Sequence, residues 1–218
     1  MIVHNLGLEN SVLNQFVLEL RDVEIQKDSM RFRKNIERIG EILSYELSKK
    51  LDYENEKVQT PLGTKEVSVP NNELVLCSIL RAGLPLHQGL LNYFDKAENA
   101  FISAYRDHKN DDEDDFDIIV EYLASPSLQN KTLILADPML ATGKTLENTF
   151  RAMQNHGTPK QIHMVSVIGS EQGVAHVKNV FPENTHLWIA AIDEKLSNRS
   201  YIIPGLGDAG DLSFGIKL

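Results

Sequence analysis

The chain has 218 residues, of which 42% are hydrophobic and 24% charged, so it is long enough for one domain (1–218) with its own core and too apolar to be disordered. Its formal net charge of −9 argues against nucleic acid as its main partner. No apolar run reaches the roughly 18–20 residues of a membrane span, so we expect no membrane partner. The single cysteine, Cys77, lies in an apolar run. We expect it in the core of a cytoplasmic protein, because no signal-peptide pattern is present.

The pattern of apolar residues along the chain predicts alternating helices and strands. Apolar residues at helical spacing from Phe32 to Leu51 predict a long helix with Ser29 as its N-cap, and polar, turn-rich sequence follows to Asn72. Unbroken apolar runs, typical of strands buried on both faces, occupy residues 74–80, 100–105, 132–136, 162–168 and 187–192. Amphipathic segments typical of crossover helices occupy residues 84–94, 145–156 and 171–181. We therefore predict an α/β fold with a mostly parallel central sheet flanked by helices.

Residues 106–131 break this alternation, because they contain no crossover helix. An acidic run, Asp111–Asp117, is followed by a strand-like stretch, Ile118–Leu123. We interpret the segment as a β-hairpin arm with a solvated acidic tip. A calcium loop is the alternative, but the run lacks the glycine and the terminal glutamate of such loops.

The loop that follows the run 132–136 ends in Thr142-Gly143-Lys144-Thr145, which resembles a nucleoside-triphosphate P-loop. A P-loop needs a glycine where this chain has Pro138, which has no N–H and a fixed φ, so we reject a triphosphate kinase. Backbone N–H groups before a helix still form a site for a phosphate, and Asp137 can accept hydrogen bonds from sugar hydroxyls. These features favour a ribose 5-phosphate. An ordinary strand–turn–helix remains the alternative.

Three further stretches are candidates for the same site. Arg81 and Arg106 each follow or end a predicted strand, where a guanidinium can bind a diphosphate, although such an arginine could also pair with an acid. Residues 201–211, YIIPGLGDAGD, are rich in glycine. They could present backbone donors and acceptors to a flat heterocycle, or form a tail that packs on the body.

Taken in order, ILRAGL, YRD, DPMLATG, residues 190–197 and YIIPGLGDAGD resemble the uracil phosphoribosyltransferases, a family of type I phosphoribosyltransferases. The resemblance implies that fold, with a β-hairpin arm (106–131) and a C-terminal hood (193–218). It implies transfer from 5-phosphoribosyl 1-diphosphate (PRPP) to uracil, giving UMP and diphosphate in pyrimidine salvage. It further implies Mg²⁺ held mainly by PRPP, no metal ligands of the protein's own, and a homodimer or higher homo-oligomer.

The resemblance also assigns roles to individual residues. Those matching PRPP-binding positions are Arg81, Arg106, Asp137, Pro138, Met139, Leu140, Ala141, Thr142, Gly143, Lys144, Thr145 and Asp208. Those matching uracil-binding positions are Ile202, Gly207, Asp208 and Ala209. Asp208 and Asp137 are the expected catalytic residues, with Asp208 acting either as a base or as an orienting group.

Lys144 departs from the family pattern, which has a small residue at this place in the loop. Either it projects to solvent, which we favour because the backbone binds the phosphate, or it adds a charge to the phosphate site. A regulator or PRPP sensor with little catalytic activity is the alternative function, for which this change is the only indication. An RNA-binding regulator is disfavoured by the negative net charge.

Overall fold

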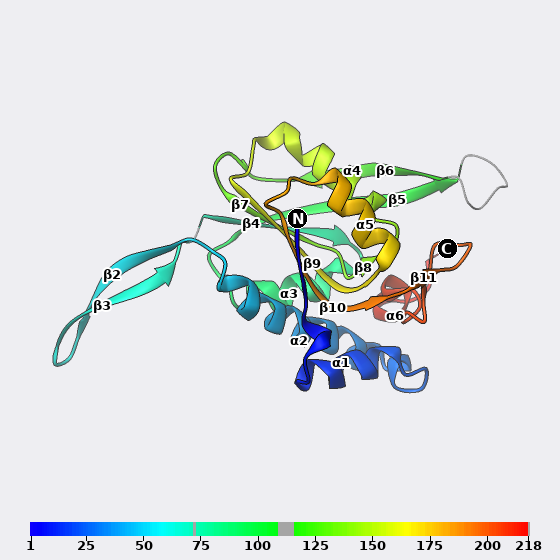
Figure 1. Ribbon diagram of the computed structural model, residues 1–218, viewed down its shortest axis with the longest axis horizontal. Helices are drawn as coiled ribbons and strands as arrows, with labels where there is room; N and C mark the ends of the chain where they lie inside the picture. Colours follow the sequence, from blue (N-terminus) through cyan, green and yellow to red (C-terminus); the bar gives the residue numbers. More distant parts are fainter. Residues whose placement is uncertain (72, 109–115, 218) are drawn as a thin grey trace.

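The computed structural model describes residues 1–71, 73–108 and 116–217, with the backbone alone described for 104–108 and 116–121. Its centre is a sheet in the order β1-β10-β9-β7-β4-β5-β6, with the short β8 also paired to β9 (Figure 1). The strands are β1 (Ile2–Asn5), β4 (Leu74–Leu80), β5 (Glu98–His108), β6 (Phe116–Ala124), β7 (Thr132–Ala136), β8 (Met139–Leu140), β9 (Gln161–Ser170) and β10 (His186–Asp193). Every pairing is parallel except β5 with β6, which confirms the predicted mostly parallel sheet.

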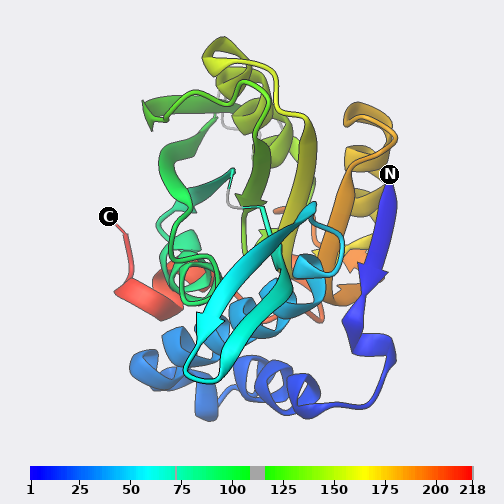
Figure 2. The ribbon, with the colours of Figure 1, turned by 90° about the vertical axis from the view of Figure 1, so that its left-hand side faces the viewer.

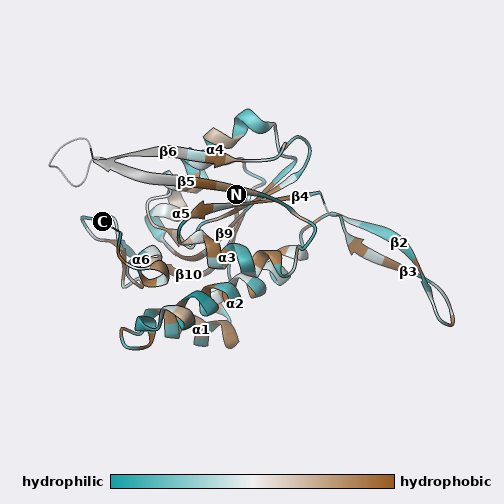
Figure 3. Ribbon diagram, turned by 180° about the vertical axis from the view of Figure 1, so that it is seen from behind, coloured by the Kyte–Doolittle hydropathy of each residue, from teal (hydrophilic) through white to brown (hydrophobic). Residues whose placement is uncertain are grey.

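Helices cover both faces of this sheet (Figure 1). One layer contains α1 (Val12–Arg21), α2 (Ser29–Ser48) and α3 (Gly83–Leu91), and the other contains α4 (Lys144–Met153) and α5 (Glu171–Val180). Alternate side chains of a strand enter different cores. Leu76 packs with α1, α2 and α3, whereas Val75 and Cys77 pack with α4 and α5. Figure 3 shows hydrophilic and hydrophobic residues interleaved along α1 and α2, as expected of helices with one buried side.

Smaller elements complete the described chain. The 3-10 helices are η1 (Leu6–Leu8), η2 (Ile25–Lys27) and η3 (Gln154–His156). The hood contains the short strands β11 (Lys195–Leu196) and β12 (Ile202–Ile203), which pair with each other, and α6 (Ala209–Phe214). Among the described residues, no helix combines the length and the apolar character that a bilayer crossing needs.

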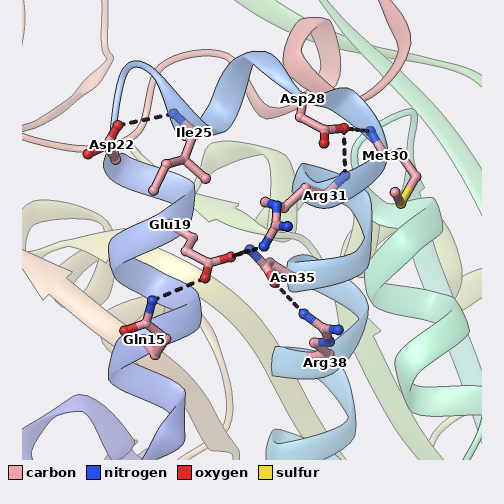
Figure 4. A network of polar contacts seen from close by, with 9 residues as sticks. All are labelled: Gln15, Glu19, Asp22, Ile25, Asp28, Met30, Arg31, Asn35 and Arg38. Carbon is pink, nitrogen blue, oxygen red and sulfur yellow. Dashed lines mark hydrogen bonds and ion pairs between the residues drawn. The ribbon is translucent and has the colours of Figure 1, made fainter.

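The N-terminal helices differ from the prediction in two ways. The cap of α2 is Asp28, whose carboxylate accepts hydrogen bonds from the N–H groups of Met30 and Arg31 (Figure 4), so the assignment of Ser29 as the cap was wrong by one residue. Both residue types can cap, and periodicity alone does not choose between neighbours. Helix α1 was not predicted, because its apolar residues do not all face the core: Leu13 is fully buried and Leu18 is 53% exposed.

The predicted hairpin arm is confirmed in β5 and β6, which are antiparallel with Arg106 opposite Ile118. The pairing begins at Phe101 and ends at Ala124, so the arm starts earlier and ends sooner than 106–131. Its tip, residues 109–115, contains most of the acidic run and lies outside the described residues.

A second hairpin, β2 (Tyr53–Thr60) with β3 (Gly63–Pro70), was not predicted. It projects from the body of the molecule (Figure 1) and faces the viewer in Figure 2, and nearly all its side chains are exposed. Because neither face of this hairpin is buried, its sequence lacks the apolar alternation by which strands are found.

Candidate active site

The main cavity lies at the carboxyl ends of the parallel strands, where α/β sheets bind their ligands. It has a volume of about 820 Å³. Three parts of the chain surround it, namely the end of β4, the loop between β7 and α4, and the hood. The lining residues are Ile79, Leu80, Arg81, Ala82, Ser103, Asp137, Met139, Leu140, Ala141, Thr142, Gly143, Thr145, Leu146, Ser200, Tyr201, Ile202, Gly207, Asp208, Ala209, Gly210 and Lys217.

The loop between β7 and α4, residues 137–143, forms one end of this cavity. The Asp137 carboxylate accepts a hydrogen bond from the Met139 N–H at 3.2 Å, and the Thr142 hydroxyl accepts one from the Lys144 N–H at 3.4 Å. Gly143 has a φ of +80°, and a Cβ there would lie 2.9 Å from Cδ2 of His176. The turn therefore needs glycine, and α4 begins at the next residue, where the N-terminus of a helix favours an anion.

Three predicted PRPP-binding residues are placed differently from the rest. Pro138 is buried behind the loop, where its carbonyl accepts the N–H groups of Val167 and Ile168 at 3.0 Å each. Lys144 is exposed and does not line the cavity. Arg106 lies in β5, but its side chain is outside the described part of the chain, so its role stays a prediction.

Arg81 follows β4 directly and reaches across to the hood. Its Nη2 donates to Oδ1 of Asp211 at 3.0 Å and to the carbonyl of Gly215 at 3.2 Å. The side chain is 41% exposed. A guanidinium therefore lies at the cavity wall, and part of it stays accessible to a ligand.

Asp208 caps α6 and lies on the other side of the same cavity. Its Oδ1 accepts the Asp211 N–H at 2.9 Å, and its Oδ2 accepts from Nζ of Lys217 at 3.2 Å. Burial opposes the charge of Asp208, but the hydrogen bond from Asp211 and the charge of Lys217 outweigh it. The pKa of Asp208 is therefore below its usual value, and the group is a carboxylate at neutral pH.

Lys217 is a residue that sequence reasoning missed. It lines the cavity and pairs with Asp208, nine positions earlier in the chain. No motif pointed to it, because a lysine near a chain end is usually a solvated surface residue. The remaining predicted residues at the base end, Ile202, Gly207 and Ala209, lie together on the cavity wall with Asp208.

Comparisons with known proteins agree with this arrangement. The family model for uracil phosphoribosyltransferase matches residues 8–216. A uracil phosphoribosyltransferase of Porphyromonas gingivalis is 56% identical over 218 residues, covering all of both chains. One of Pyrococcus furiosus is 36% identical over 210 residues, covering 95% of this chain and 88% of its own. The solved structure of the AQ2163 protein from Aquifex aeolicus has a TM-score of 0.88 at 29% identity and full coverage of both chains. The chain belongs to the uracil phosphoribosyltransferase family.

Proposed function

We propose that the protein transfers the 5-phosphoribosyl group of PRPP to N1 of uracil, forming UMP and diphosphate in pyrimidine salvage. The observation that carries this proposal is the cavity at the strand ends. It joins an anion-binding loop at the start of α4 to a hood rich in backbone donors and acceptors, in a chain of this family.

In this proposal the loop binds the phosphoribosyl end of the substrate. The N–H groups of residues 142–145, with the hydroxyls of Thr142 and Thr145, hold the 5-phosphate, and Asp137 accepts hydrogen bonds from the ribose hydroxyls. Arg81, together with Arg106, neutralises the diphosphate as it leaves. Binding the far end of the ribose positions its C1 for displacement.

The hood binds uracil through Ile202, Gly207, Asp208 and Ala209. Backbone groups with fixed orientation discriminate between uracil and cytosine. At position 4 and at the neighbouring ring nitrogen, the hydrogen-bond donor and acceptor of uracil are exchanged in cytosine. Cytosine would leave buried polar groups without partners. The hood also excludes water, which would otherwise hydrolyse PRPP.

Asp208 orients groups in this scheme and does not act as the general base. Its lowered pKa makes it a weaker base than an ordinary carboxylate, and Lys217 already occupies one of its oxygens. Asp137 likewise orients the ribose, by accepting hydrogen bonds from its hydroxyls.

Mg²⁺ would enter with PRPP and be held mainly by the diphosphate and ribose oxygens. Among residues 1–71, 73–108 and 116–217 there is no group of three or more His, Cys, Asp or Glu able to hold a metal ion. The ion would supply charge neutralisation on the departing diphosphate. Asp137 and Asp208 line the cavity. Their carboxylates are the protein groups there that would suit a hard ion such as Mg²⁺.

We further propose a cytoplasmic homodimer or higher homo-oligomer in which the β2–β3 hairpin packs on a second copy. An isolated two-stranded hairpin is marginally stable in water, and this one exposes Val58 (47%), Leu62 (99%) and Val67 (42%). We expect the double variant Val58→Asp/Leu62→Asp to be a monomer by light scattering. Leu8→Asp, at another exposed leucine (82%), should leave the oligomer intact.

The activity is tested by measuring diphosphate release from PRPP and Mg²⁺ with uracil, orotate or hypoxanthine as the acceptor. We expect release with uracil and identify the product as UMP by mass. Tight PRPP binding without release would support the PRPP sensor instead. Release only with orotate or hypoxanthine would contradict the assignment of the hood to uracil.

A further inference from the structure

A buried ion pair lies behind the base end of the cavity. Arg21, the last residue of α1, forms a bidentate pair with Asp193, the last residue of β10, at 2.7 Å and 2.8 Å. The side chain of Asp193 is 9% exposed and that of Arg21 is 24% exposed. Neither residue lines the cavity, and neither was assigned a role by the resemblance, although Asp193 lies in the stretch 190–197 that contributes to it.

Both members of the pair also hold the backbone of Gly205. The Gly205 N–H donates to Oδ2 of Asp193 at 3.0 Å, and Nη1 of Arg21 donates to the Gly205 carbonyl at 3.0 Å. Gly205 has a φ of +59°, and a Cβ there would lie 2.1 Å from the carbonyl oxygen of Ile202. The turn is therefore tight, and both polar backbone groups of its glycine are fixed by one ion pair.

This turn connects the residues that face the base. Ile202 precedes it, and Gly207 and Asp208 follow it within three residues, all on the cavity wall. A rotation of the turn would break the contacts of Gly205 and would reorient these neighbouring peptide groups. The phosphate loop has anchors of its own, since Asp137 and Pro138 bond to the backbone of β9 and Ala141 accepts from Ser170, which is the neighbour of Asp193 in the sheet.

We propose that Arg21 and Asp193 are positioning residues for base recognition, which fix the Gly205 turn in the orientation that accepts uracil. This inference rests on the proposed function. The charged pair holds both backbone groups of Gly205 at once, which neutral side chains of the same size would do less firmly. It predicts a defect mainly with uracil, because the 137–145 loop, which holds the 5-phosphate in this scheme, has its own bonds to β9, although both ligands share Asp208.

The test compares Arg21→Gln, Asp193→Asn and the double variant with the wild type. Two constants are measured, kcat/KM for uracil at saturating PRPP and Mg²⁺, and the Kd for PRPP alone. We expect each variant to lose about tenfold or more in kcat/KM for uracil and to keep its Kd for PRPP within about twofold. Arg21→Lys should recover part of the loss, because lysine keeps the charge without the planar fork.

Arg31→Gln is the matched control, since the Arg31–Glu19 pair also ties α1 to the body but does not touch the hood (Figure 4). It should leave both constants within about twofold. The double variant has no unpaired buried charge, so it keeps the test informative if a single variant unfolds.

The outcomes separate the inference from the proposed function. No turnover of uracil by the wild type would overturn the proposed function, and with it this inference. If the wild type turns over uracil, unchanged kcat/KM in the double variant would overturn the inference alone. A loss of PRPP affinity as large as the loss for uracil would also overturn it, because the pair would then be a general structural contact.

Discussion

We propose that one end of the cavity binds the phosphate of PRPP and the other end binds the base, and these two ends are built in different ways. The phosphate end is one continuous stretch, residues 137–145, whose conformation follows from its own glycine and from the start of a helix. The base end depends on segments far apart in the chain, including Arg21, Asp193 and the turn at Gly205. A site made by one loop can be found from local sequence, whereas a site held by long-range contacts needs the fold.

The largest expected effect is at the base end, in Gly205→Ala. The new Cβ would meet the Ile202 carbonyl at 2.1 Å, and the residue would keep a positive φ that alanine rarely adopts. Strain of about 1–3 kcal/mol, relieved by moving the turn, should lower kcat/KM for uracil by about tenfold to a hundredfold. Initial rates at saturating PRPP measure this.

Gly157→Ala is the control for that variant, because Gly157 also has a positive φ and a close neighbour but lies outside the main cavity. Both variants should melt at a lower temperature, and only Gly205→Ala should lose activity with uracil. An equal loss in both would show that general destabilisation explains the defect.

At the phosphate end, Arg81→Ala should weaken PRPP binding by about tenfold to a hundredfold, since a charge-assisted hydrogen bond contributes about 1.5–3 kcal/mol. Calorimetric titration with PRPP measures it. Arg33→Ala is the control, because Arg33 also binds a backbone carbonyl of the hood, that of Ser213, without lining the cavity. Unchanged PRPP affinity in Arg81→Ala would refute the assignment of Arg81 to the diphosphate.

Thr142→Ala should have a smaller effect, because it removes one neutral hydroxyl from a site made mainly of backbone N–H groups. We expect the Kd for PRPP to rise by about threefold to tenfold, corresponding to a net 0.5–1.5 kcal/mol. Thr158→Ala, at an exposed threonine outside the main cavity, should leave the Kd unchanged. A loss of a hundredfold or more in Thr142→Ala would mean that side chains dominate phosphate binding.

The smallest effect concerns pH and Asp208. Its folded pKa lies below the value of about 3.9 for an unfolded aspartate, so its stabilising charge is complete above about pH 4 and is lost as pH falls through the folded pKa. The charge of Asp208 should therefore not change between about pH 5 and 8. A pH profile of kcat/KM for uracil should show no acid limb in that range that Asp208→Asn removes. Such a limb would instead identify Asp208 as the general base.

The sequence predicted best those elements whose conformation depends on residues close together in the chain. The strand over residues 132–136 and the loop after it were predicted from an unbroken apolar run and a helix start, and β7 has those bounds. Helix α1 and the β2–β3 hairpin were missed because their exposed residues include apolar side chains and their patterns lack a clean period. The Arg21–Asp193 pair joins positions 172 residues apart, and no local pattern encodes such a contact.

The separate construction of the two ends is tested most directly by combining Thr142→Ala with Arg21→Gln. The Kd for PRPP and kcat/KM for uracil at saturating PRPP are measured for the wild type, both single variants and the double variant. We predict that Thr142→Ala alone sets the change in PRPP affinity and Arg21→Gln alone sets the change in kcat/KM for uracil, so the double variant reproduces both to within about twofold. A double variant in which either constant departs from its single variant by about fivefold or more would contradict the account, because the two ends would then be coupled.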